Sequence, residues 1–382
     1  MADSIHTYRW VSQIDRSLYD IYIFSSSNYR PHQKFAALPR ISGFFKTNHH
    51  CAIVGFTLFD FINRVLTFTL TKLFGNGWHR RWLSKTIHAL NPDIVHSLEF
   101  QAGGYLTLEV QQKFEGNFPR WIATNWGSDI YYFSRFDKHK SKIQAVLEHA
   151  DCYSAECERD YGLAKELGFK GTSMPVIPNA GGIDLKSVEP LRNRVSPLNR
   201  KTIIVKGYES TFGRAINVLK ALELCADKLE GYEIRVFSAS PETEAYVQEL
   251  QKNPLLNIGV VSSTINKISH EDMLDLHANA RVYIGNSISD GISTSMLEAI
   301  ALGAFPIQSC TSCAAEWITH GETGFIPDPS SEPEIADCLV EALQNDVLVE
   351  DAYNKNWETV CSKLDAENIR KIANSFYEKA LV

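Results

Sequence analysis

Two carboxylates stand eight positions apart in the stretch "SDGISTSMLEAIALGAFPIQS", residues 289–309. They are Asp290 and Glu298, and small, mostly hydroxyl-bearing residues fill much of the space between them. Gly291 lets the backbone approach a ligand closely, and the amides at the start of the helix-like run that follows suit a diphosphate. Glu298 lies one turn beyond Thr294, about 6 Å along the helix axis, where it can accept hydrogen bonds from a ribose diol.

Two basic residues in another part of the chain also lie between a predicted strand and the helix that follows it. Lys206 ends the strand-like run "KTIIVK", and Arg214 stands just before the next helix-like run. In open α/β sheets, ligands bind beyond the carboxyl ends of the strands, where such loops converge. Lys206 and Arg214 can therefore supply counter-charge to a diphosphate, Arg214 as a bidentate fork.

Each of these residues also has a purely structural interpretation. Asp290 can be the N-cap of a helix and Glu298 a solvated acid on its surface. Lys206 and Arg214 can be ordinary surface charges. The convergence favours a binding site, because two bases, two acids and a glycine-opened helix all follow strands of one predicted domain.

Composition limits the classes of function. A chain of 382 residues with 44% apolar residues is long enough for two domains with cores. Its 38 basic and 45 acidic residues give a net charge of −7, which argues against a general nucleic-acid binder. Eight cysteines are too dilute for a disulfide scaffold, and the single CxxC, Cys310 to Cys313, lacks the partners of a zinc site. We expect reduced cysteines and no metal.

Targeting features are also weak. The opening "MADSIHTYRW" does not resemble a secretory signal. The most apolar window, Cys51 to Phe74, is interrupted by Asp60, Arg64 and Lys72, so it is not expected to span a bilayer. The expected location is the cytoplasm, with peripheral contact at the inner face of the cytoplasmic membrane.

Helix-like and short apolar strand-like runs alternate along the chain, which indicates parallel sheets covered on both faces. A helix that Ser4 can cap opens the chain, and the window Cys51–Phe74 is predicted as one or two helices. Strands are predicted in the first block at residues 19–27, 92–100, 119–130, 150–156 and 174–185, and in the second at 201–208, 232–240, 257–263, 281–287 and 305–309.

The domain prediction follows from this alternation. The polar segment 186–200, with two prolines, is the best candidate for a linker. The predicted parts are a first Rossmann-like domain over residues 1–190, a second over 200–360, and a final helix over 361–382 that packs back on the first domain. The fold class is therefore α/β, with two Rossmann-like domains facing a cleft.

The second block also carries a family resemblance. Its acid-x7-Glu pair, Asp290 and Glu298, followed by "EWITHGETGFIPDP", resembles the signature of the family-four (group 1) retaining glycosyltransferases of the GT-B fold. Upstream, "PDIVHS", "GSDI", "ADCYSAE" and "VIPNAGGID" resemble the acceptor-domain landmarks of that family, in the right order. The resemblance covers nearly the whole chain.

The resemblance implies a nucleotide-sugar donor on the second domain and sugar transfer with retention, without a metal or other cofactor. Glu298 would hold the ribose hydroxyls, and Asp290 would contact the transferred sugar. The predicted catalytic residues are Asp290, Lys206 and Arg214. The predicted donor-binding residues are Gly207, Gly291, Ile292, Ser293, Thr294 and Glu298.

This chain departs from the family pattern at four places. The first acid is Asp290 where the family usually has Glu, "KGYESTFGR" replaces the usual Gly-Arg-x4-Lys-Gly loop, and Trp126 stands where many relatives have a histidine. The family's usual opening strand also has no counterpart before the first helix. Such a strand would lie inside the first sheet, so either the protein begins upstream or neighbouring strands close the gap.

The first domain is predicted to bind the acceptor. Gly127, Ser128 and Asp129 are the candidate acceptor contacts. The aromatic and basic mixture within residues 44–85 suits the surface of a membrane, with the basic residues from His79 to Lys85 meeting lipid phosphates. The alternative is that this region simply covers the sheet.

We therefore predict a retaining hexosyltransferase that moves a sugar from a nucleotide-diphosphate sugar to a glycan or lipid-linked acceptor, in surface polysaccharide synthesis. No nucleic-acid partner is expected. Two alternatives remain: a nucleotide-sugar isomerase or hydrolase of the same fold, and a non-catalytic nucleotide-sugar-binding partner.

Overall fold

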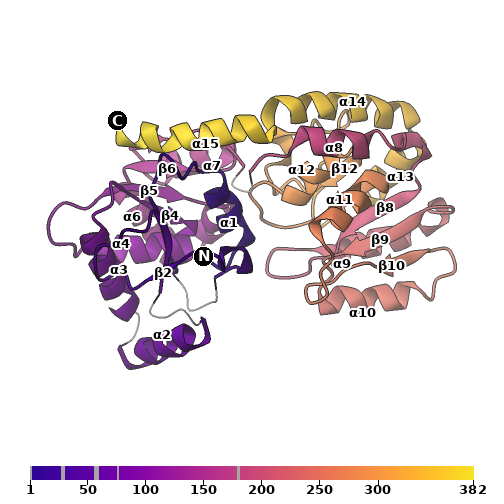
Figure 1. The fold of residues 1–382 in the computed structure, drawn as a ribbon. Helices are drawn as coiled ribbons and strands as arrows, with labels where there is room; N and C mark the ends of the chain where they lie inside the picture. The colour runs from indigo at the N-terminus through magenta and orange to yellow at the C-terminus, as the bar shows by residue number, and fades with distance from the viewer. Residues whose placement is uncertain (1, 27–30, 56–59, 75–76, 179–180) are drawn as a thin grey trace. The chain divides into compact units, whose positions relative to one another are not determined.

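The protein consists of two compact units in a computed structural model that describes residues 2–26, 31–55, 60–74, 77–178 and 181–382. Unit 1 comprises residues 1–181 and 369–382, and unit 2 comprises residues 182–368. Both units are α/β, with sheets made of parallel strands (Figure 1). None of the described helices is both long and apolar enough to cross a membrane.

Unit 2 has one five-stranded parallel sheet in the order β10-β9-β8-β11-β12. Its two central strands bury successive side chains on both faces, as expected when helices cover a parallel sheet on both sides. The strands are β8 (Thr202–Lys206), β9 (Glu233–Phe237), β10 (Ile258–Val260), β11 (Ala280–Gly285) and β12 (Phe305–Gln308).

Serine caps begin three helices of unit 2. Ser240, Ser269 and Ser331 each accept a hydrogen bond from a backbone amide in the first turn of the helix that follows, which satisfies one of its orphan donors. The helices are α8 (Leu185–Arg192), α9 (Ala215–Leu224), α10 (Pro241–Leu250), α11 (His270–Asn279), α12 (Thr294–Ala301), α13 (Glu332–Gln344) and α14 (Asp346–Lys363). Side chains of α9 and α13 form the main core with β8, β9 and β11.

The segment 186–200 was predicted to be a polar linker, and this prediction is wrong. It contains most of α8 and a 3-10 turn, Pro197–Asn199, and two of its arginines are buried in unit 2. Arg200 donates to four backbone carbonyls, those of Arg192, Val195, Ala280 and Leu302, and burial lowers its pKa to about 10. Arg192 lies over the ring of Tyr353, 3.4 Å from its centroid. Composition misled the prediction because these arginines bind carbonyls instead of water.

Unit 1 contains two parallel sheets among its described residues. The first has the order β1-β3-β2, with β1 at Ile21–Phe24, β2 at Arg40–Ile41 and β3 at Cys51–Val54. The second has the order β4-β5-β6-β7, with strands at Ile94–Leu98, Arg120–Thr124, Cys152–Ser154 and Thr172–Ser173. Helix α1 (Ile5–Ser12) precedes β1 and is capped by Ser4, as predicted.

Two predictions of secondary structure in unit 1 are wrong. The apolar window beginning at Cys51 opens with strand β3, and its helix α2 extends only over Asp60–Phe74. A short apolar run such as "CAIV" fits a strand or a helix equally well by periodicity. The strand predicted over residues 174–185 is not formed by the described part of that range, 174–178 and 181–185. The last strand of the sheet, β7, ends before it at Ser173.

The remaining helices of unit 1 cover its sheets. They are α3 (Gly77–Leu90), α4 (Tyr105–Gln111), α5 (Ser128–Tyr131), α6 (Asp137–His149) and α7 (Glu158–Glu166). The last helix of the chain, α15 (Ala366–Leu381), buries Ile369, Ala373, Phe376 and Ala380 in a cluster with Trp10 of α1. The hydroxyl of Tyr377 accepts a hydrogen bond from Trp10 Nε1 at 2.8 Å, so the two ends of the chain are joined within unit 1.

Replacement of Arg200 by lysine tests the role of the 186–200 segment. A lysine has one ammonium group and cannot reach four carbonyls in a fork, so we expect Arg200→Lys to destabilise unit 2 by about 2–4 kcal/mol. Thermal unfolding followed by circular dichroism measures the loss. Arg194→Lys is the matched control, because Arg194 forms an exposed pair with Asp275 worth at most about 1 kcal/mol. Equal melting temperatures for the two variants would contradict the assignment.

Candidate functional site

The order in which the chain adds strands to the sheet of unit 2 reverses between β8 and β11. From β8 the chain proceeds outward to β9 and β10, and then returns to form β11 and β12 on the other side of β8. Parallel sheets bind ligands beyond the carboxyl ends of the strands at such a reversal. The loops after β8 and β11, residues 207–214 and 286–293, both begin there.

Backbone hydrogen bonds join these two loops. The amide of Arg214 donates to the carbonyl of Asn286 at 3.0 Å, and Asn286 Nδ2 donates back to the carbonyl of Arg214 at 3.1 Å. The amide of Ile288 donates to the carbonyl of Phe212 at 2.8 Å. The structure therefore brings together the loop of the predicted bases and the loop of the predicted acids, which are about eighty residues apart in the sequence.

Two glycines in the first loop allow the backbone to pass close to its neighbours. A Cβ atom at Gly207 would lie 2.6 Å from Val236 Cγ1 and 2.9 Å from Ala239 Cα. A Cβ atom at Gly213 would collide with the carbonyl oxygen of Tyr208. Gly207 was predicted as a donor-binding residue. The structure shows that the backbone there lies too close to Val236 and Ala239 for a side chain to fit.

The second loop leads into helix α12, and backbone amides at the start of this helix are available as hydrogen-bond donors. Ser293 occupies the N-cap position, but its side chain makes no capping hydrogen bond and lies 3.3 Å from the Tyr283 hydroxyl instead. Among the described residues, the backbone amides of Ile292, Ser293 and Thr294 find no acceptor. These donors and the helix dipole favour an anion at this position.

The structure contradicts the purely structural interpretation of both acids. Asp290 is not the N-cap of α12, since Ser293 holds that position; its Oδ1 accepts from the Gly291 amide at 2.9 Å. Glu298 is not a solvated surface acid, since only 8% of the residue is exposed. Its Oε1 lies 3.0 Å from Nε2 of His270, the first residue of α11. His270 was missed because no motif or spacing in the sequence connects it to Glu298.

The two predicted bases differ in their surroundings. Lys206 is the half-buried last residue of β8, and no hydrogen bond or ion pair engages its ammonium group among the described residues. Arg214 donates from Nη1 to the carbonyls of Ser210 and Gly213 at 2.9 and 2.7 Å and lies 4.0 Å from the Glu209 carboxylate. Arg214 therefore shapes its own loop, and Lys206 is the better available cation.

Gly127, Ser128 and Asp129 lie in unit 1, at the carboxyl end of β5. Gly127 has φ +93°, a conformation that favours glycine, and Ser128 begins α5. Asp129 is buried and accepts from the amides of Trp126 and Phe100 at 2.7 and 3.1 Å. Burial, together with the charge of Glu99, raises its pKa well above the ordinary value. Asp129 therefore links the segments that follow β4 and β5 through two hydrogen bonds.

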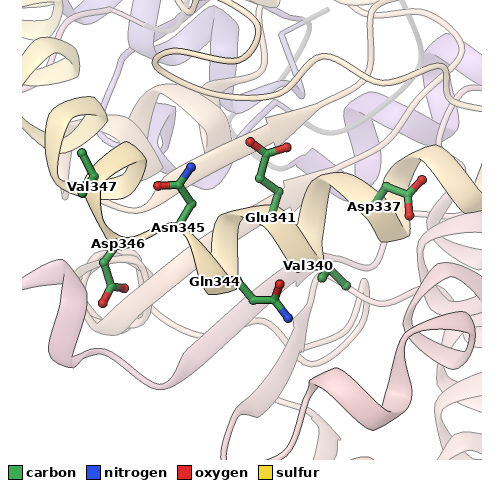
Figure 2. A pocket seen from close by; sticks show the side chains of 7 residues that line it. All are labelled: Asp337, Val340, Glu341, Gln344, Asn345, Asp346 and Val347. Carbon is green, nitrogen blue, oxygen red and sulfur yellow. The ribbon is translucent and has the colours of Figure 1, made fainter.

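A different hollow of unit 2, about 670 Å³, lies along α13 and the start of α14 (Figure 2). Its side chains point in different directions, and Asp346 is already paired with the buried Arg281 at 2.6 Å. Arg281 is the second residue of β11, so this hollow lies toward the amino-terminal edge of the sheet. It is therefore not the site formed by the loops after β8 and β11.

The sequence of this region matches a known family. Residues 198–358 fit the family model described as "Glycosyl transferases group 1". Most of unit 2 is therefore similar to the group 1 glycosyl transferases. The match includes the loops after β8 and β11, helix α12 and the segment that follows β12, which is the region whose motifs carried the predicted resemblance.

A curated protein is also similar to part of this chain. The chain is 26% identical over 175 residues to the 2-deoxystreptamine N-acetyl-D-glucosaminyltransferase of Niallia circulans, a match that covers 45% of this chain and 43% of that protein. The chain therefore spans less than half the length of this curated relative.

Solved structures are similar over nearly the whole chain. Sucrose-phosphate synthase from Thermosynechococcus elongatus matches with a TM-score of 0.71 and 15% identity, over 98% of this chain and 92% of that one. HepE of Anabaena in complex with UDP-glucose matches with a TM-score of 0.64 and 12% identity, over 99% and 97%. These likenesses show the GT-B fold, which confirms the predicted fold class.

Substitution of Gly213 tests the junction of the two loops. The Cβ of Gly213→Ala would force the carbonyl of Tyr208 away and shift the hydrogen bonds to residues 286–288, so we expect nucleotide binding to weaken about ten-fold or more while the fold persists. Calorimetric titration with UDP measures the binding, and circular dichroism checks the fold. Gly259→Ala is the control, since its Cβ meets only the end of the Arg235 side chain at 3.3 Å. Unchanged binding in Gly213→Ala would contradict this role.

Proposed function

We propose that this chain is a retaining glycosyltransferase that moves a hexosyl group from a nucleoside-diphosphate sugar to a hydroxyl of a glycan or lipid-linked acceptor, in surface polysaccharide synthesis. The observation that carries the proposal is the placement of the open first turn of α12, with Glu298 one turn further along, at the sheet reversal of a unit similar to the group 1 glycosyl transferases. The UDP-glucose complex of HepE, a protein of the same fold, supports the class of donor.

In the proposed complex, the diphosphate lies at the open amides of Ile292, Ser293 and Thr294, with Lys206 beside it. The Glu298 carboxylate accepts hydrogen bonds from the ribose hydroxyls. Arg214, held in its loop by backbone carbonyls, adds positive charge and keeps that loop in shape. Asp290, between β11 and α12, contacts the transferred sugar.

The proposed reaction exchanges one bond at the anomeric carbon for another on the same face of the sugar. The bond from that carbon to the diphosphate oxygen breaks, and a bond to the acceptor oxygen forms. The departing phosphate takes the proton of the acceptor hydroxyl. Donors fixed before the reaction stabilise the charge that develops on the leaving group, so the amides of α12 with Lys206 and Arg214 take the role that a metal has in other enzymes. We propose that no metal or other cofactor is needed.

Removal of the Glu298 carboxylate tests the donor site. Hydrogen bonds to a charged group contribute about 1.5–3 kcal/mol, so we expect Glu298→Ala to weaken UDP binding about 10- to 100-fold in calorimetric titration. Arg214→Ala should also weaken binding. Glu341→Ala is the matched control, because Glu341 lines the hollow on α13. Loss of binding in the Glu341 variant, with normal binding in the Glu298 variant, would place the nucleotide in that hollow instead.

Product analysis separates transfer from its alternatives. Incubation of the unmodified chain with UDP-glucose or UDP-N-acetylglucosamine and candidate acceptors should give a glycoside whose anomeric configuration, read by NMR, equals that of the donor. A free sugar or an altered nucleotide sugar as the sole product would identify a hydrolase or isomerase. UDP binding without any turnover would identify a nucleotide-sugar-binding partner.

We also propose peripheral contact with the inner face of the cytoplasmic membrane through unit 1. Helix α2 lies at the outside of unit 1 (Figure 1). Apolar side chains at helical spacing are exposed on it, among them Ile62, Leu66 and Leu73 at 46%, 40% and 69%. Of the basic residues predicted to meet lipid phosphates, His79 does not fit, because it is buried and burial lowers its pKa. Residues 56–59 and 75–76 of the predicted region lie outside the described residues.

Co-sedimentation with vesicles tests this contact. The unmodified chain should sediment with vesicles that contain anionic lipid, and a triple serine variant of Ile62, Leu66 and Leu73 should lose most of this binding, since it removes three apolar side chains from the interface. A triple serine variant of Leu224, Leu255 and Val347, which are exposed apolar residues of unit 2, is the control. Equal binding by both variants would rule out α2 as the contact.

A further inference from the structure

We infer that His270 is a positioning residue that fixes the Glu298 carboxylate for the ribose, and that it thereby sets the preference of this chain for ribonucleotides over 2′-deoxyribonucleotides. The inference rests on the proposed function, because it concerns the same donor site. Its basis is the contact of 3.0 Å between His270 Nε2 and Glu298 Oε1.

His270 is itself held in a fixed place. It is the first residue of α11, and Ser269 at the N-cap accepts from the Asp272 amide at 3.0 Å and donates to the Asp272 carboxylate at 2.7 Å. This capping arrangement fixes the backbone that carries the imidazole. Helix α11 packs directly against α12, so a ring at the start of one helix reaches a carboxylate on the other.

The environments of the two side chains are unequal. Only 10% of the Glu298 side chain is exposed, whereas 59% of the His270 side chain is exposed. The contact therefore joins a nearly buried carboxylate to a largely exposed imidazole, so removal of the ring leaves no cavity in the core. Its main consequence is that it restricts the rotamers of a glutamate, which would otherwise lose that freedom when the ligand binds.

A fixed carboxylate matters for a ribose because the two hydroxyls of the sugar are adjacent and rigidly placed. A carboxylate accepts from both only in a narrow range of orientations, and a site built to bond a hydroxyl discriminates against ligands that lack it. When His270 holds Glu298 in that orientation, removal of the 2′-hydroxyl costs affinity. When the contact with His270 is removed, the orientation of Glu298 is less restricted and part of this discrimination is lost.

The test compares UDP with 2′-deoxy-UDP in calorimetric titrations, or GDP with 2′-deoxy-GDP if the unmodified chain binds GDP more tightly. We expect His270→Ala to weaken binding of the ribonucleotide about three- to ten-fold, which is the effect of about one hydrogen bond, and to leave binding of the deoxynucleotide unchanged. His270→Gln keeps an N–H donor at a similar reach and should restore the discrimination. Glu271→Ala, one residue further along α11 and exposed, is the control that should match the unmodified chain.

The double variant His270→Ala, Glu298→Ala completes the test. If His270 acts through Glu298, the double variant should bind UDP no more weakly than Glu298→Ala alone, because coupled residues are not additive. A further loss in the double variant would mean that His270 contacts the nucleotide itself, which overturns the inference.

The outcomes separate this inference from the proposed function. If Glu298→Ala abolishes the discrimination but His270→Ala keeps it, the donor site stands and the role of His270 is wrong. An equal loss of UDP and 2′-deoxy-UDP binding in His270→Ala would indicate a purely structural role and would also overturn it. If the unmodified chain binds neither nucleotide, or if Glu298→Ala binds UDP normally, the proposed function fails and the inference fails with it.

Discussion

The hydrogen bonds between the loop after β8 and the loop after β11 are the constraint on which the rest of the candidate site depends. They connect Arg214 with Asn286 and Phe212 with Ile288, at the point where the sheet of unit 2 reverses its order. Without them, Lys206 and the first turn of α12 would belong to two independent loops. A collision at Gly213 would disturb this junction, because the chain leaves no room there for a side chain.

Buried arginines secure the opposite edge of the same sheet. Arg200 and Arg281 are almost fully buried near the starts of β8 and β11, and both donate to backbone carbonyls that end neighbouring elements. Those carbonyls, and Asp346 for Arg281, take the place of water around the two guanidinium groups. The strands are thus fixed at their amino ends by arginines and joined at their carboxyl ends by loops, so the loops keep one geometry.

The contact between His270 and Glu298 restricts one functional side chain, as the loop hydrogen bonds and the arginines restrict the backbone. A glutamate at the second turn of a helix has the reach to meet a ribose, but its rotamer is not determined by the helix alone. The contact with His270 on α11 restricts it. The packing of α11 against α12 therefore acts on ligand discrimination, and not only on stability.

The sequence by itself determined the alternation of strands and helices in unit 2, the paired acids Asp290 and Glu298, and the start of α12 after Gly291. These features depend on periodicity and on neighbours within a few residues. Only the tertiary structure decided what depends on distant partners. Segment 186–200 looks like a linker, but its Arg200 donates to carbonyls at the start of β11 and at the end of α12. His79 looks like a surface base, but it lies on the buried face of α3. His270 reaches Glu298 across 28 residues, a separation that no local pattern encodes.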